Sequence, residues 1–221
     1  MSAKRKKEIP EEIAEYAINK YGDPTRRKVR PPLDQLIQSA LWRYTSVRRG
    51  TRALRQLKRT FVDWNEVRVS PPVEIASAMA TTDWATTAAE HIKKILESLF
   101  DLRNVVSLGF LDELTTAQAR TFLRSLQEVP RDLADEVLLF SIDAKTFPIN
   151  IHTARMAYRL GLVKNPRATQ TNQRSLMKLW DKDDYVAVDQ LFVDNAREIC
   201  SESEPRHKKC PVESICPKKG L

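Results

Sequence analysis

The sequence predicts an all-α fold, and three observations support that prediction. Only 5 of the 221 residues are glycine, and apolar residues recur at helical spacing along most of the chain. The one strand-like alternation, Val67-Arg68-Val69, is too short to build a sheet. Hydrophobic residues make up 42% of the chain and charged residues 30%, and no apolar run approaches the roughly 20 residues of a membrane span.

The expected helices follow from apolar periodicity and from the turn-forming residues between them. The N-terminal half is expected to hold helices over 11–20, 33 to about 41 and 85–100, a basic helix through residues 48–59, and a helix that follows Pro71 and Pro72 and ends near residue 79. Thr115-Thr116-Ala117-Gln118 has the order of a capping box and is expected to open the next helix. The C-terminal half is expected to hold helices over 131–141, 150–159, 175–180 and 186–199.

The formal net charge of +8 favours a polyanionic partner, and its placement strengthens that expectation. No acidic residue lies between positions 35 and 62. Four arginines step by four, three and four within this stretch and form one stripe on a helix: Arg48, Arg52, Arg55 and Arg59. Because a stripe of one sign repels itself, duplex DNA is the expected partner. The basic N-terminus has no apolar segment behind it, so we expect no secretory signal and a cytoplasmic protein, nucleoid-associated if bacterial.

The tail holds all three cysteines of the chain and a histidine in a compact pattern. Cys200, His207, Cys210 and Cys216 read as C-x6-H-x2-C-x5-C. Four soft or borderline ligands in so short a segment are able to wrap one metal centre. Three cysteines cannot all pair within one chain, so a metal site is favoured over a disulfide framework.

This tail resembles the iron–sulfur loop of the endonuclease III family of DNA glycosylases, whose pattern is C-x6-C-x2-C-x5-C. Every spacing matches, with His207 in place of the second cysteine. The resemblance implies a 4Fe–4S cluster on the four tail residues; zinc and a site without metal stay open as alternatives. It also implies that basic residues inside the loop contact DNA phosphates, namely Arg206, Lys208 and Lys209.

The resemblance implies two helical domains. Residues 33–144 would form a six-helix barrel that contains a helix–hairpin–helix motif, and residues 1–32 with 145–221 would form a second domain carrying the metal loop. Family members flip a damaged base out of the duplex into a cleft between the domains. The family's wedge residue falls at Arg43 or Tyr44, so we expect one of these to contact DNA, with a packing role as the alternative.

The hairpin motif of the family, L-P-G-V-G-R-K-T-A, is matched in part by residues 126–134, LQEVPRDLA. Val129 and Arg131 match the pattern and are expected to lie at the DNA. The two family glycines, which let backbone amides approach a phosphate, are replaced by Glu128 and Pro130. We therefore expect the turn to form but its hold on a phosphate to be weakened.

Both catalytic positions of the family are changed. Its Schiff-base lysine aligns with Asp132, and its aspartate, in a segment that resembles V-D-T-H-x-x-R, aligns with Asn150. A carboxylate forms no Schiff base, and an amide is no base. Structural roles suit both residues, since Asn150 is a good helix N-cap and Asp132 lies in a first helical turn.

The sequence thus predicts a DNA-binding protein of the endonuclease III type without standard glycosylase or lyase catalysis. One alternative is an active glycosylase with displaced groups, for which the nearby candidates are Asp132, Asp135, Asp143 and His152. Another is a helical metal-binding scaffold or redox regulator that does not act on DNA. The oligomeric state is left open.

Overall fold

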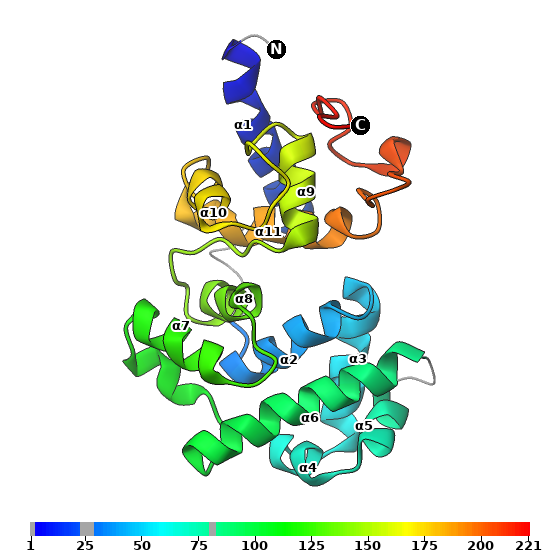
Figure 1. Ribbon diagram of the computed structural model, residues 1–221, viewed down its shortest axis with the longest axis vertical. Coiled ribbons are helices and arrows are strands. Elements are labelled where there is room, and N and C mark those ends of the chain that lie inside the picture. Colours follow the sequence, from blue (N-terminus) through cyan, green and yellow to red (C-terminus); the bar gives the residue numbers. More distant parts are fainter. Residues whose placement is uncertain (1–2, 23–28, 80–82) are drawn as a thin grey trace. The chain divides into compact units, whose positions relative to one another are not determined.

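The computed structural model describes residues 3–22, 29–79 and 83–221, and these hold helices and no strand (Figure 1). The all-α prediction is therefore confirmed. The chain divides into two compact units, one made of residues 1–28 with 145–221 and the other of residues 29–144. We call these the terminal unit and the central unit. None of the described helices is both long and apolar enough to cross a membrane.

The central unit is built from seven α-helices and one 3-10 turn within the described residues. They are α2 (Pro32–Trp42), α3 (Val47–Thr60), α4 (Trp64–Val69), α5 (Pro72–Met79), α6 (Asp83–Arg103), η2 (Gly109–Glu113), α7 (Thr116–Ser125) and α8 (Arg131–Ser141). The long α6 lies along α4 and α5, and α2 packs against α3, α6 and α8 (Figure 1). One apolar core joins all of these elements.

Helix α8 is the most enclosed element of the central unit, because every residue from Leu133 to Ser141 is buried. It lies against α2, whose residues 33–41 are also buried. Trp42 and Phe140 meet edge to face across this contact, with ring centroids 6.4 Å apart. The direction of α8, and hence of the hairpin turn before it, is set by this packing.

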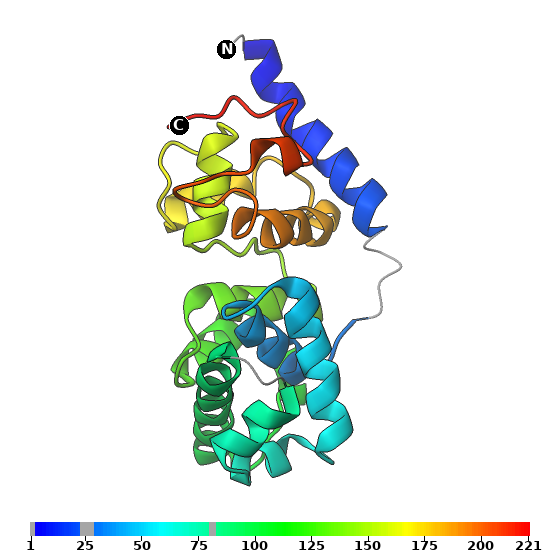
Figure 2. The same cartoon turned by 90° about the vertical axis from the view of Figure 1, so that its right-hand side faces the viewer.

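The terminal unit contains α1 (Ala3–Tyr21), α9 (Ile151–Arg159), α10 (Gln170–Leu176), η3 (Lys182–Asp184), α11 (Tyr185–Ala196) and η4 (His207–Lys209). Helix α1 packs on α11, as Figure 2 shows. This contact brings the first helix of the chain against a helix near its C-terminus. Phe147 lies at the centre of an aromatic core, stacked on Trp180 at 5.7 Å and edge-on to Tyr185 and Phe192.

The helix expected over 11–20 is longer at its start, because α1 begins at Ala3 and contains Pro10. A proline interrupts the helical hydrogen bonds, which is why the sequence suggested a later start. The carbonyl of Pro10 is held by the indole nitrogen of Trp180, 2.7 Å away. Packing against the rest of the unit thus stabilises a helix that local propensity disfavours.

One further expectation was wrong. The helix expected over 175–180 runs instead from Gln170 to Leu176, capped by Thr169, whose hydroxyl accepts from the Asn172 amide. This segment is so polar that its helical period is hidden. The strand-like residues 67–69 end helix α4, because Asp63 caps it and accepts from the Glu66 amide. The capping box at Thr115 and Gln118 is confirmed.

Candidate nucleic-acid interface and metal loop

The arginine stripe lies on the solvent face of α3. Ser46 caps this helix by accepting from the Arg49 amide, and Ala53, Leu54 and Leu57 turn into the core. The side chains that share the opposite face are all exposed: Arg48, Arg52, Arg55 and Arg59. Among the described residues no ion pair joins them to a carboxylate, so the stripe presents uncompensated positive charge.

The hairpin turn keeps a tight shape without glycine. Glu128 has a φ of 60°, in the left-handed region that glycine normally occupies and that costs other residues about 1–2 kcal/mol. Its carbonyl is held by His91 Nε2 at 2.8 Å. Its carboxylate lies outward, 3.6 Å from the ammonium of Lys94. The position of a family glycine therefore still has the conformation that glycine serves.

His91 ties this turn to the end of α2, a link that no sequence pattern indicated. A carbonyl only accepts, so His91 Nε2 carries the proton and Nδ1 accepts from the Tyr44 hydroxyl, 3.0 Å away. Burial lowers the pKa of His91, which favours this neutral form. Tyr44 packs against the core and lies edge-on to the imidazole. Its hydroxyl thus has a structural partner.

The N-terminus of α8 has no side-chain cap, and Pro130 occupies the cap position. Asp132 lies in the first turn and accepts from Arg43 at the end of α2, 2.7 Å away. Val129 is buried, with 5% of its surface exposed, so its side chain packs into the core. Arg131 is partly buried, with its Nε 3.4 Å from Asp135.

Two more carboxyl groups lie beneath the surface of α8. Asp135 is 1% exposed and is paired with Arg120 at 2.7 Å as well as with Arg131. Glu136 is 5% exposed, is hydrogen-bonded with Ser39 of α2, and has no partner at Oε2 in the described structure. Burial raises the pKa of the Glu136 carboxyl to about 8, and the nearby Asp132 contributes to the same shift. Glu136 is therefore a carboxyl that keeps its proton at neutral pH.

Asn150 caps α9 as expected from the sequence. Its side-chain oxygen accepts from the amides of His152 and Thr153 at 2.9 and 3.0 Å. His152 Nδ1 lies 3.3 Å from the guanidinium of Arg155, which also donates to the carbonyls of Ala196 and Cys200. These contacts hold the start of the metal loop against α9.

The four tail residues of the metal pattern line one cavity, together with Arg159. Within the described part of the chain, however, no three His, Cys, Asp or Glu side chains are close enough to hold a metal ion. Burial raises the pKa values of Cys210 and Cys216, and Cys200 lies near enough to add to both shifts. The donor set of three thiols and one imidazole fits an iron–sulfur cluster or zinc in its chemistry.

Arg159 is the buried centre of this loop. It is 5% exposed and donates to the Cys200 sulfur at 3.3 Å. It also donates to the backbone carbonyls of three successive loop residues, Cys200, Ser201 and Glu202, at 3.1, 2.6 and 2.9 Å. The Cys216 thiol in turn donates to the Arg159 carbonyl at 3.5 Å. The basic residues Arg206, Lys208 and Lys209 are exposed on the loop.

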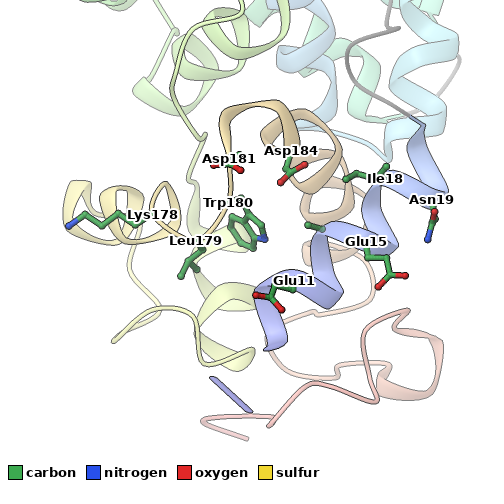
Figure 3. A pocket seen from close by; sticks show the side chains of 10 residues that line it. Glu11, Glu15, Ile18, Asn19, Lys178, Leu179, Trp180, Asp181 and Asp184 are labelled. Carbon is green, nitrogen blue, oxygen red and sulfur yellow. The ribbon is translucent and has the colours of Figure 1, made fainter. Parts of the chain in front are cut away.

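Another cavity of the terminal unit is lined by several acidic side chains. It lies between α1 and the turn at residues 178–184, as Figure 3 shows, and Trp180 forms part of its wall. Four carboxylates surround it: Glu11, Glu15, Asp181 and Asp184. Burial raises the pKa of Asp184, and crowding by Asp181 adds to the shift. Phosphate is repelled here, so the basic surfaces described above are the candidate DNA contacts.

Comparison with known proteins gives matches of low identity over most of the chain. Endonuclease III of Thermotoga maritima is 23% identical over 206 residues, which are 93% of this chain and 91% of that protein. The DNA glycosylase/AP lyase ROS1 of Arabidopsis thaliana is 22% identical over 193 residues, 80% of this chain but 14% of that protein. A solved non-covalent endonuclease III–DNA complex has a TM-score of 0.70 and 18% identity, covering 99% of this chain and 97% of that chain. No family model matches.

The chain is similar in sequence to endonuclease III-type DNA glycosylases and shares the fold of the solved endonuclease III. Its match spans less than half the length of the plant relatives. In this chain Glu128 has a positive φ in the turn before α8, Asp132 is engaged in an ion pair, and Asn150 is engaged as a helix cap.

We predict that Glu136 makes the central unit less stable as pH rises from about 4.5 to about 8. Over this range the unfolded carboxyl loses its proton while the folded one keeps it, so unfolding becomes easier by about 1.4 kcal/mol per pH unit. Glu136→Gln has no proton to lose. Its stability relative to the unaltered protein should rise with pH up to about 8 and then stay constant.

Urea unfolding at a series of pH values measures this difference. An unpaired amide in the variant adds a penalty that does not vary with pH, so the slope and not the offset carries the result. Glu113→Gln, an exposed acid on η2, is the matched control and should run parallel to the unaltered protein. A difference between Glu136→Gln and the unaltered protein that is flat across pH would contradict the prediction.

Proposed function

We propose that this protein binds duplex DNA in the manner of the endonuclease III type and lacks the standard glycosylase and lyase chemistry. The observation that carries the proposal is the exposed arginine stripe of α3, which has no acidic partner among the described residues. Its spacing along one helix face suits a run of backbone phosphates. The solved structural relative is a complex with DNA, which supports the same partner.

The hairpin adds a second basic surface. Arg43 lies at the end of α2 with its side chain 40% exposed, and Arg131 begins α8. The amides at the start of α8 have no side-chain cap, and they suit an anion in line with the dipole of the helix. Asp132 opposes this attraction, because its carboxylate occupies the same turn. We propose that a phosphate competes with Asp132 for Arg43.

The absence of standard chemistry rests on the roles that two residues already have. Asp132 offers no amine for a Schiff base and is held by Arg43 at 2.7 Å. The side-chain oxygen of Asn150 already accepts two amide protons, and the group carries no charge. Of the displaced candidates, Asp135 is buried between two arginines, which disfavours proton transfer to a substrate.

For the tail we propose a 4Fe–4S cluster held by Cys200, His207, Cys210 and Cys216. The gathering of all four side chains around one cavity supports the assignment, as does the Arg159 hydrogen bond to the Cys200 sulfur. When bound, such a cluster cross-links the loop, and exposed Arg206, Lys208 and Lys209 then face a phosphate backbone from a fixed scaffold. Zinc remains the alternative ion for the same donors.

We predict that Arg52→Gln with Arg55→Gln weakens duplex binding across all sequences, because phosphate contacts carry no sequence information. The slope of log affinity against log salt should fall by about one for each phosphate that the variant leaves unbound. Fluorescence anisotropy with a labelled duplex measures both quantities. Arg174→Gln with Lys178→Gln removes the same charge from exposed positions on the terminal unit and should change neither by as much. A duplex affinity that does not change with salt concentration would contradict the proposal.

We predict no base release or strand cleavage above background on duplexes with an abasic site, an oxidised base or an alkylated base. Borohydride should trap no covalent protein–DNA adduct, since position 132 has no amine. The double variant Asp132→Lys with Asn150→Asp restores the lysine and the aspartate of the family pattern. Borohydride should trap a covalent adduct between this variant and DNA. Robust turnover that Asp132→Ala abolishes would instead establish a displaced active site.

We predict that protein purified without air is brown, with iron and sulfide in near-equal amounts, and that His207→Ala loses most of the visible band. His207→Cys, which supplies the fourth thiolate of the family pattern, should keep the band with a lowered reduction potential. Zinc in place of iron would select the alternative ion, and protein without either metal would overturn the metal assignment.

A further inference from the structure

Glu136 has no part in the proposed contacts, yet its surroundings are unusual for a carboxyl group. It lies in the buried contact between α8 and α2, where its exposed fraction is 5%. Ser39, itself 1% exposed, is its one hydrogen-bond partner, and Oε2 has none in the described structure. An ionised carboxylate so placed lacks both solvent and a counter-ion in contact with it. The enclosed position therefore favours a neutral, protonated group.

The charged groups around Glu136 come from three helices. On α8 itself, Asp132 lies one turn before it and Asp135 is its neighbour in sequence. From the end of α2, Arg43 interacts with it electrostatically. From α7, Arg120 is engaged on Asp135 at 2.7 Å. Among the charged groups that act on Glu136, Asp132 raises its pKa most and Arg43 lowers it, and Asp135 adds a smaller increase.

This arrangement connects a buried proton to the surface. Asp132 is 13% exposed and Arg43 is 40% exposed, and they are joined at 2.7 Å. While Glu136 is neutral, one carboxylate and one guanidinium balance each other at this end of α8. When Glu136 is ionised, two carboxylates one helical turn apart act on the same guanidinium. A phosphate that competes for Arg43 then meets one more negative charge.

We propose that Glu136 is a positioning residue that links a proton to DNA binding: its neutral carboxyl leaves Arg43 available to a DNA phosphate, and its ionisation holds Arg43 to α8. The proposal rests on the duplex binding argued above and adds its regulation. By reciprocity, binding of a phosphate near α8 favours the protonated form of Glu136, so DNA binding takes up protons.

The expected pH range differs from that of His91 on α6 and from that of two thiols in the terminal unit. Burial raises the pKa of Glu136 to about 8. Burial lowers the pKa of His91, which lies on α6 and contacts the hairpin turn, so it changes charge below its ordinary range. The thiols of Cys210 and Cys216 have raised pKa values and change charge above theirs. A change centred near pH 8 that Glu136→Gln abolishes is therefore assigned to Glu136.

The test measures the dissociation constant of a labelled undamaged duplex from about pH 7 to about pH 9 at constant ionic strength. The unaltered protein should bind roughly fivefold more weakly at the upper end, from one added charge at a partly screened distance. Glu136→Gln should bind with the low-pH affinity throughout. Arg43→Gln should bind more weakly at low pH and show no dependence. Glu113→Gln, the exposed acid of η2, should keep the full profile.

Proton uptake gives a second readout that a merely structural role would not change. Calorimetric titration near pH 8 in two buffers of different ionisation enthalpy should detect fractional uptake by the unaltered protein and none by Glu136→Gln or Arg43→Gln. Because Arg43 is a surface residue, its variant serves even where the buried substitution unfolds the unit.

Two outcomes are distinguishable. If duplex binding is present but its pH profile is flat, or is the same in Glu136→Gln, the proton link is overturned. If no variant binds the duplex at any pH or salt concentration, the proposed DNA binding itself fails. Circular dichroism across the same pH range shows that each protein stays folded during the measurement.

Discussion

The contact between α2 and α8 decides the geometry of the hairpin turn and of the charged groups around it. Three pairs of side chains cross this contact: Arg43 with Asp132, Ser39 with Glu136, and Trp42 with Phe140. The first pair is ionic, the second polar and the third aromatic. Since α8 is buried along nearly its whole length, its N-terminus cannot move without breaking these contacts. The hairpin turn, which ends at that N-terminus, takes its place from the same contact.

The turn shows how a local shape is kept when the residues that usually provide it are absent. A left-handed residue other than glycine costs about 1–2 kcal/mol. Here Glu128 bears that cost, and a hydrogen bond from His91 to its carbonyl offsets part of it. Tyr44 fixes the imidazole in turn. Long-range contacts thus replace local conformational freedom, and the turn before α8 keeps its shape.

The elements with clear apolar periods or caps could be predicted from the sequence, and those set by tertiary contacts could not. Asn150 and Thr115 cap their helices as their sequence context indicates. The four arginines of the stripe share one face of α3 because their spacing puts them on the same side of a helix, and that face is exposed. Helix α1 passes through Pro10 because α11 and Trp180 support it, and no local rule reveals that support.

Of the site residues that sequence reasoning missed, Glu136 left a signal and His91 did not. Glu136 stands among Leu133, Val137 and Phe140, on the apolar face of α8, where an acid is out of place. A buried charge at a core position of the helical period marks a group that is paired, protonated or functional. His91 lies in an ordinary helical context on α6, and its two partners are 37 and 47 residues away.

The loop that holds Cys200, His207, Cys210 and Cys216 is shaped by hydrogen bonds from α9, apart from any metal that it would bind. Arg159 donates to three successive loop carbonyls and to the Cys200 sulfur from a buried position. Hydrogen bonds from a charged donor contribute about 1.5–3 kcal/mol each, so α9 alone supplies substantial support to the loop. A loop supported in this way depends less on four identical thiolates. In the proposed cluster, His207 at the position of the second cysteine of the family pattern would change one ligand, and the backbone around it need not change.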